Sequence, residues 1–197
     1  MSFRSPFPDV EIPDLSVYDF LFGSIDETDL DRPALIDGPS GGVTDYRTLI
    51  GQVDGIAGAL AARGIAVGDV VGLLAPNVPA FAAVFHGILR AGATATTINA
   101  LYTAADIVKQ LEDSGAKALV TVSPLLPQAA EAAKTVGIPD DMLIVLDGAE
   151  GHPSLRALLA ERAAAPDVSF DPATPLAVLP YSSGTTGRPK GIEPALS

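Results

Sequence analysis

The sequence predicts an α/β fold, with a mostly parallel sheet flanked by helices on both of its faces. Short apolar segments alternate with helices that carry an apolar stripe, which is typical of right-handed β–α–β crossovers. The short segments are apolar on both sides, as strands covered by two helical layers require. Hydrophobic residues make up 48% and charged residues 18% of the 197 positions, which is enough apolar material for one core.

The first predicted helix precedes the sheet. The proline-rich opening of the chain is expected to run extended, and Asp14 is expected to cap a helix that ends at Phe22. The apolar side of this helix would be formed by Val17, Phe20 and Leu21. We interpret the acidic stretch at residues 26–31 as a solvent-exposed loop.

A regular alternation of helices and strands follows. Strands are predicted at residues 70–74, 93–98, 117–122 and 142–146. Helices are predicted from Thr44 or Asp45 to Gly64, from about Pro79, from a Thr-x-x-Asp capping signature at Thr103 and Asp106, and at 124–136 and 154–164. In the first of these helices, apolar residues recur every three or four positions, as a buried stripe requires. They are Leu49, Val53, Ile56 and Leu60.

The end of the chain is predicted to start a second unit. The segment Ala165–Pro175 contains three prolines and two aspartates, which indicates a connector. Residues 176–180 then begin a strand for which no later chain is available as a partner. We therefore predict an amino-terminal α/β subdomain at residues 1–170 and the start of a second subdomain at residues 171–197.

Composition excludes several classes of function. A formal net charge of −12 argues against nucleic acids and anionic membranes as partners, because both prefer a basic surface. The sequence has no apolar run long enough for a membrane span and no signal-peptide pattern, so we expect a cytoplasmic protein. With no cysteine and only two isolated histidines, His86 and His152, no metal site is predicted. We expect His86 to be a core or half-buried residue.

One segment near the end of the chain has the composition of an anion-binding loop. The sequence from Tyr181 to Gly191 reads YSSGTTGRPKG. Its glycines let backbone N–H groups approach a ligand, its hydroxyls add compact donors, and its lysine adds a positive charge. The candidate phosphate-binding residues are Ser182, Ser183, Gly184, Thr185, Thr186, Gly187 and Lys190. The spacing differs from the P-loop and from the dinucleotide-binding motif, and on composition alone a flexible linker remains an alternative.

These eleven residues closely resemble the signature loop of the adenylate-forming superfamily, which includes acyl-CoA synthetases, luciferases and amino-acid adenylation domains. Residues 68–121 are similar to the first core region of that family, with its Pro-Asn, Ala-Gly and Asn-x-x-Tyr-Thr elements. Residues 5–22 are similar to the start of 4-coumarate–CoA-ligase-like members. The resemblance thus covers nearly the whole chain.

The resemblance implies a two-step ligase reaction. A carboxylate attacks the α-phosphate of ATP, which enters with Mg²⁺, and the products are an acyl-adenylate and pyrophosphate. The thiol of coenzyme A then displaces AMP and forms a thioester. By the family pattern, the β- and γ-phosphates are held by Ser182, Ser183, Gly184, Thr185, Thr186 and Lys190.

The sequence departs from the family after Gly191, where Ile192–Ser197 lacks the usual helix start. We interpret this tail as a truncation or a change of reading frame, with the catalytic residues and the acyl pocket expected beyond it. The chain alone is therefore expected to be inactive. The alternatives are another adenylating activity, either amino-acid-loading or luciferase-like, and a non-catalytic remnant that binds other proteins or self-associates through an unpaired strand near residues 176–179.

Overall fold

The computed structural model describes residues 6–8, 13–169, 175–182 and 190–191, and the structural findings concern these residues. The helices are α1 (Val17–Phe22), α2 (Tyr46–Ala62), α3 (Pro79–Arg90), α4 (Ala104–Ser114), α5 (Leu126–Val136) and α6 (Leu155–Ala160), with short 3-10 turns at Glu27–Asp29, Ser123–Leu125 and Asp140–Met142. The strands are β1 (Pro33–Ile36), β2 (Val43–Asp45), β3 (Val70–Leu74), β4 (Thr94–Thr97), β5 (Ala116–Thr121), β6 (Leu143–Val145), β7 (Tyr181–Ser182) and β8 (Lys190–Gly191). Among the described helices, none is long and apolar enough to cross a membrane.

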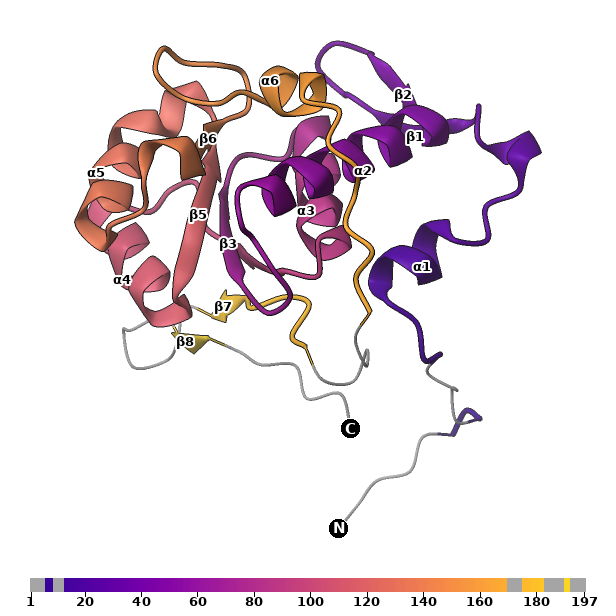
Figure 1. Cartoon of the computed structure of the whole chain (residues 1–197), viewed down its shortest axis with the longest axis horizontal. Coiled ribbons are helices and arrows are strands. Elements are labelled where there is room, and N and C mark those ends of the chain that lie inside the picture. Colours follow the sequence, from indigo (N-terminus) through magenta and orange to yellow (C-terminus); the bar gives the residue numbers. More distant parts are fainter. Residues whose placement is uncertain (1–5, 9–12, 170–174, 183–189, 192–197) are drawn as a thin grey trace.

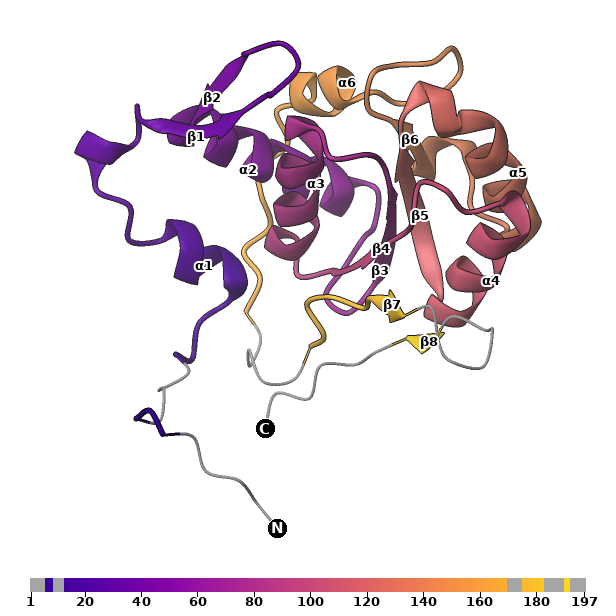
Figure 2. The same cartoon turned by 180° about the vertical axis from the view of Figure 1, so that it is seen from behind.

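The centre of the fold is a parallel sheet in the order β4-β3-β5-β6. All three pairings are parallel, with Val71 opposite both Ala95 and Ala118, and Val120 opposite Ile144. Helices α2 and α3 cover one face of this sheet, and α4 and α5 cover the other (Figures 1 and 2). The predicted α/β class, with a parallel sheet flanked on both faces, is confirmed.

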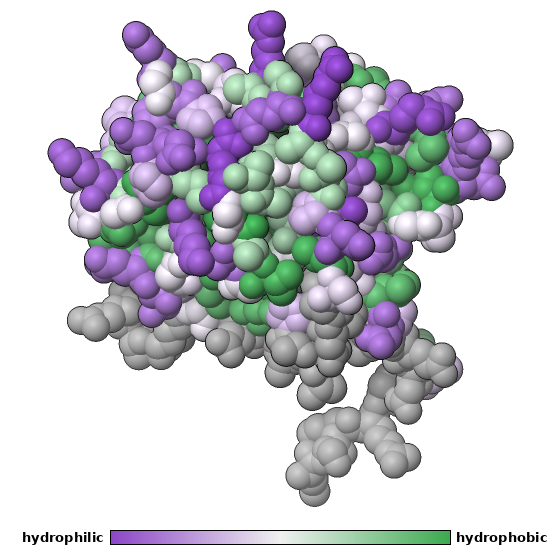
Figure 3. All heavy atoms as spheres, viewed as in Figure 1, coloured by the Kyte–Doolittle hydropathy of each residue, from purple (hydrophilic) through white to green (hydrophobic). Residues whose placement is uncertain are grey.

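Helix α1 differs from its prediction in cap and in orientation. Its cap is Ser16, whose hydroxyl accepts a hydrogen bond from the backbone N–H of Asp19 at 3.0 Å, and not Asp14. Tyr18 and Phe22 face the core. The residues predicted to form its apolar side, Val17, Phe20 and Leu21, are 38%, 58% and 43% exposed, and hydrophobic residues show at the surface over α1 (Figure 3). A six-residue helix has room for one inward stripe, and the aromatic pair occupies it.

The stretch after α1 contains an antiparallel hairpin that the sequence did not predict. In it, β1 pairs with β2, with Ile36 opposite Val43, and the backbone N–H of Asp37 donates to the carbonyl of Gly42 at 2.8 Å. The turn needs a left-handed backbone at Gly41, where φ is +70°. The hairpin leads directly into α2.

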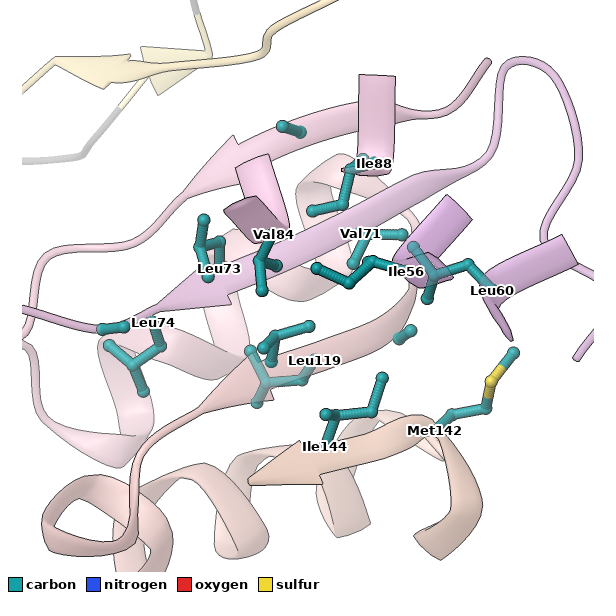
Figure 4. Packing of buried hydrophobic residues seen from close by; sticks show 14 of the residues in the cluster. Ile56, Leu60, Val71, Leu73, Leu74, Val84, Ile88, Leu119, Met142 and Ile144 are labelled. Atoms are coloured by element: carbon teal, nitrogen blue, oxygen red, sulfur yellow. The ribbon is translucent and has the colours of Figure 1, made fainter. Parts of the chain in front are cut away.

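The core lies between the helices and the sheet. Ile56 of α2 and Val84 and Ile88 of α3 pack against Val71 and Leu73 of β3 (Figure 4). The predicted stripe of α2 is confirmed, because all four of its residues are buried: Leu49, Val53, Ile56 and Leu60. Full burial of one such side chain contributes about 1.5–3 kcal/mol, so this stripe fixes α2 on the sheet.

Two helix caps were predicted correctly. The Asp45 carboxylate accepts the backbone N–H of Thr48 at 2.7 Å at the start of α2. At the start of α4, the Thr103 hydroxyl accepts the backbone N–H of Asp106 at 3.3 Å. Each cap satisfies a donor that the first helical turn leaves unpaired.

Helix α6 is shorter than predicted and ends at Ala160 instead of Ala164. Beyond it, the backbone of residues 163–164 crosses α2 at Gly58, where a side chain would collide with it. Arg63, which follows α2, binds Glu161 through two hydrogen bonds of 2.8 and 2.6 Å and also donates to the carbonyl of Ala59 at 2.9 Å. Helix α6 therefore ends where Arg63 binds Glu161 and the following residues cross α2.

The Arg63–Glu161 ion pair predicts a pH-dependent contribution to stability. The hydrogen bonds from Arg63 lower the pKa of Glu161 below its ordinary value. A lowered folded-state pKa gives stability that is present above the unfolded-state pKa and is lost as the pH falls. At pH 7 we expect Glu161→Gln to reduce the free energy of unfolding by about 0.5–1 kcal/mol.

This difference between the wild type and Glu161→Gln should shrink as the pH falls below about 4, near the ordinary glutamate pKa. Urea unfolding followed by circular dichroism at pH 7 and at pH 3 measures it. Glu150→Gln is the matched control, because Glu150 is exposed and forms no ion pair among the described residues. A constant difference at both pH values would contradict the prediction.

The strand expected at residues 176–180 does find a partner, contrary to the prediction. Val178 forms a parallel bridge with Ala95, so the segment lies along the outer edge of β4. That partner precedes it by about eighty residues and belongs to the first part of the chain. The proposed domain boundary at residue 170 stays a prediction, and residues 170–174 of the connector lie outside the described part.

Candidate functional site

The two ends of the Gly/Ser/Thr-rich segment form a hairpin. Strands β7 and β8 pair antiparallel, with Tyr181 opposite Gly191 and Ser182 opposite Lys190. The structure thus brings together the first and last candidate phosphate-binding positions, Ser182 and Lys190. The predicted residues between them lie outside the described part of the chain, and their role in phosphate binding stays a prediction: Ser183, Gly184, Thr185, Thr186 and Gly187. The same holds for the tail at 192–197.

Backbone hydrogen bonds hold the segment before this hairpin on β4. The N–H of Ala95 donates to the carbonyl of Ala177 at 3.0 Å, and the N–H of Leu179 donates to the carbonyl of Ala95 at 2.9 Å. Two threonines of β4 reinforce the pairing: the hydroxyl of Thr94 donates to the carbonyl of Leu176 at 2.5 Å, and that of Thr96 to the carbonyl of Leu179 at 2.8 Å. The approach to the loop is therefore part of the sheet.

A buried glutamine extends this polar network to α4. Gln110 is 2% exposed, and its side-chain amide donates to the Thr96 hydroxyl at 2.9 Å and to the Thr97 carbonyl at 3.0 Å. Because the Thr96 hydroxyl gives its own proton to Leu179, the Gln110 amide nitrogen must face the threonine. The network runs from α4 through β4 to Leu179.

The hairpin itself is joined to α4 by a second polar contact. The Tyr181 hydroxyl donates to Oδ2 of Asp113 at 2.6 Å. Burial raises the pKa of Tyr181, and the neighbouring Asp113 carboxylate raises it further. The phenol therefore remains a protonated donor at physiological pH, and the contact persists.

Sequence reasoning missed Gln110, Asp113 and the two threonines as supports of the loop. One signal was available for Gln110: it shares a helical face with Ile107 and Leu111, which are buried. A glutamine on an apolar face needs hydrogen-bond partners inside the fold. The other residues gave no local signal, because their partners lie far away in the sequence.

The histidines do not form a metal centre with other described residues, and no group of three His, Asp or Glu residues in the described ranges could hold a metal ion. His86 lies edge-on between two aromatic rings, with ring centroids 5.4 Å from Phe22 and 5.3 Å from Phe85. Burial lowers the pKa of His86. This is the half-buried packing role that the sequence indicated.

Comparison with known proteins identifies the family. The model of the AMP-binding enzyme family matches residues 23–193, so the chain belongs to that family. The match covers the parallel sheet and the Gly/Ser/Thr-rich loop. The resemblance to adenylate-forming enzymes in the sequence is confirmed.

Individual relatives are CoA ligases. The chain is 38% identical to 4-coumarate–CoA ligase 5 of Oryza sativa subsp. japonica, over 96% of this chain and 34% of that protein. A benzoate CoA ligase from Burkholderia xenovorans is similar in structure, with a TM-score of 0.74 and 27% identity over 91% of this chain and 34% of the other. The anthranilate CoA ligase AuaEII, in complex with anthranoyl-AMP, shares the fold with a TM-score of 0.82 and 24% identity, over 92% and 35% of the two chains. The chain spans about a third of the length of these relatives.

Proposed function

We propose that this chain is the ATP-phosphate-binding part of an AMP-forming carboxylate–CoA ligase. The supporting observation is the pairing of β7 with β8, which sets Ser182 opposite Lys190 inside the region that the family model matches. The hydroxyls, glycines and lysine of this segment suit a chain of net charge −12, because they attract phosphate locally. The candidate residues bind and orient the β- and γ-phosphates and transfer no proton.

In the first step, a carboxylate oxygen forms a bond to the α-phosphorus of ATP. The bond between the α-phosphorus and the oxygen that bridges the α- and β-phosphates breaks. The products are acyl-adenylate and pyrophosphate, whose charge Lys190 would neutralise. In the second step the sulfur of coenzyme A bonds to the acyl carbon, AMP leaves, and the thiol proton is released. Mg²⁺ accompanies ATP as part of the substrate. We place this reaction in the cytoplasm.

An aromatic acid is the proposed carboxylate, since relatives are named for 4-coumarate and benzoate. A fatty acid is the second class to test, because a long-chain-fatty-acid CoA ligase shares the fold. The residues that choose between them are expected outside the 197 residues. The self-associating remnant is less favoured, because the strand at Leu176–Leu179 on which it rested pairs with β4.

Carboxylate-dependent exchange of pyrophosphate into ATP tests the proposal. It should be assayed with aromatic and fatty acids, on the 197-residue chain and on the longest chain that its gene encodes. We expect exchange in the longer chain and none in the 197-residue chain, because the relatives are about three times as long. Absence of pyrophosphate exchange in both chains with every acid would contradict the ligase proposal.

A further inference from the structure

The segment that leads into the loop is held rigidly on one side only. Leu179 is fixed by the sheet and by the Thr96 hydroxyl, which in turn is held by Gln110. Pro180 follows with a fixed φ angle and no N–H to donate. Beyond Pro180 the chain leaves β4, because the pairing with β4 ends at Leu179. The hairpin β7–β8 therefore needs a second point of attachment to have a defined direction.

The Tyr181–Asp113 contact supplies that attachment. Among the described residues, it is the one hydrogen bond that joins β7 or β8 to a helix. Asp113 lies three residues after Gln110 on α4, so the two side chains leave the helix on the same side. One face of α4 thus holds Leu179 through Thr96 and Tyr181 directly. Both cartoon views show the hairpin beside the end of α4 (Figures 1 and 2).

The direction of the hairpin matters because the loop starts from it. Ser182 follows Tyr181 directly and is paired with Lys190, so a rotation of β7 moves both candidate phosphate-binding positions together. Phosphate binding by positioned donors is sensitive to displacements of about 1 Å. A contact at the base of the loop can therefore change ATP binding without touching ATP.

We propose that Asp113 is a positioning residue for the ATP phosphates: it holds the Tyr181 hydroxyl and thereby sets the direction of β7, which carries Ser182 opposite Lys190. This inference rests on the proposed ligase function and deepens it. Asp113 acts through Tyr181. Its effect therefore requires an oxygen at position 113 that accepts the hydrogen bond, but it does not require a negative charge there. The variants Asp113→Asn and Asp113→Ala separate these two requirements.

A double-mutant cycle tests the inference in the longest chain that the gene encodes. We expect Tyr181→Phe and Asp113→Ala each to raise the KM for ATP about 3- to 10-fold in pyrophosphate exchange, with the KM for the carboxylate unchanged. The double variant should be no worse than either single variant, and Asp113→Asn should stay near the wild type. Tyr46→Phe is the control, because Tyr46 starts α2, away from the loop.

Amide hydrogen exchange gives a second readout that needs no activity. Protection of the amides that join β7 to β8 should fall in Tyr181→Phe and Asp113→Ala but not in Asp113→Asn. Additive effects of the two single changes, or an unchanged KM for ATP in an active enzyme, would overturn the inference alone. A wild type without exchange activity would contradict the proposed function, and the inference would fall with it.

Discussion

Replacement of Gly58 by alanine is expected to destabilise the fold by about 3 kcal/mol or more. Gly58 lies in the buried carboxy-terminal part of α2, where the connector after α6 crosses the helix. A β-carbon there would overlap the carbonyl oxygen of Ala163 and would lie 2.6 Å from its carbonyl carbon and 2.8 Å from the carbonyl oxygen of Ala164. These are backbone atoms, which cannot rotate away as a side chain can.

Movement of the connector away from Gly58 would also cost free energy, because one arginine holds it on each side of the crossing. Arg63 binds Glu161 before it. After it, Arg90 donates to the carbonyl of Pro166 at 3.0 Å and to Asp54 at 3.1 Å. Relief of the clash would break at least one of these contacts, and the cost of the substitution includes that loss.

A matched control exists two turns earlier on the same helix. Gly51 is exposed in α2, and a β-carbon there would meet no atom within 4 Å. Gly51→Ala should raise the free energy of unfolding by about 0.5–1 kcal/mol, because alanine loses less backbone entropy in a helix. Urea unfolding of the 197-residue chain measures both variants. Equal stability of Gly58→Ala and Gly51→Ala would show that the crossing is not a close contact.

Replacement of Lys190 by alanine is expected to reduce carboxylate-dependent pyrophosphate exchange about 100-fold in the longest encoded chain. The proposed role of Lys190 is to neutralise charge on the leaving pyrophosphate, and Lys190 is the one cation in strands β7 and β8, which consist of Tyr181–Ser182 and Lys190–Gly191. The loss should fall on ATP use and leave the KM for the carboxylate unchanged. Lys190→Arg keeps the charge and should recover part of the activity.

Lys134→Ala serves as the control for a general loss of positive charge, since Lys134 lies on the exposed side of α5. Its exchange activity should match that of the wild type. Full activity of Lys190→Ala would show that Lys190 is not a phosphate-binding residue. That result would leave the role of the neighbouring hydroxyls open to a separate test. Equal losses in Lys190→Ala and Lys134→Ala would point to net charge and away from a specific contact.

Most of the central sheet could be predicted because its signals are local. The stripe Leu49–Leu60 and the caps at Asp45 and Thr103 each lie within a few residues of the structure that they determine. The α1 cap was misassigned because Asp14 and Ser16 are both good capping residues, and only the position of the following aromatic pair chooses between them. The hairpin β1–β2 was missed because its strands are only four and three residues long.

What could not be predicted depends on partners that are distant in the sequence. The end of α6 is set by the crossing at Gly58, about a hundred residues earlier. The pairing of Val178 with Ala95 and the contact of Tyr181 with Asp113 are of the same kind. The motif at Tyr181–Gly191 was visible because its composition is itself the signal, whereas its supports on α4 and β4 are ordinary residues in ordinary elements.

The pairing of residues 176–179 with β4 has a consequence for the order of synthesis and folding. A ribosome that makes this chain completes β4 about eighty residues before it reaches the segment that covers its outer edge. At about 5–20 residues per second, that edge, with the polar groups of Thr94 and Thr96, stays unpaired for roughly 4–16 seconds. During this interval the sheet of the nascent chain can accept a strand from another molecule at the edge of β4. The interval ends when Leu176–Leu179 pairs with that edge.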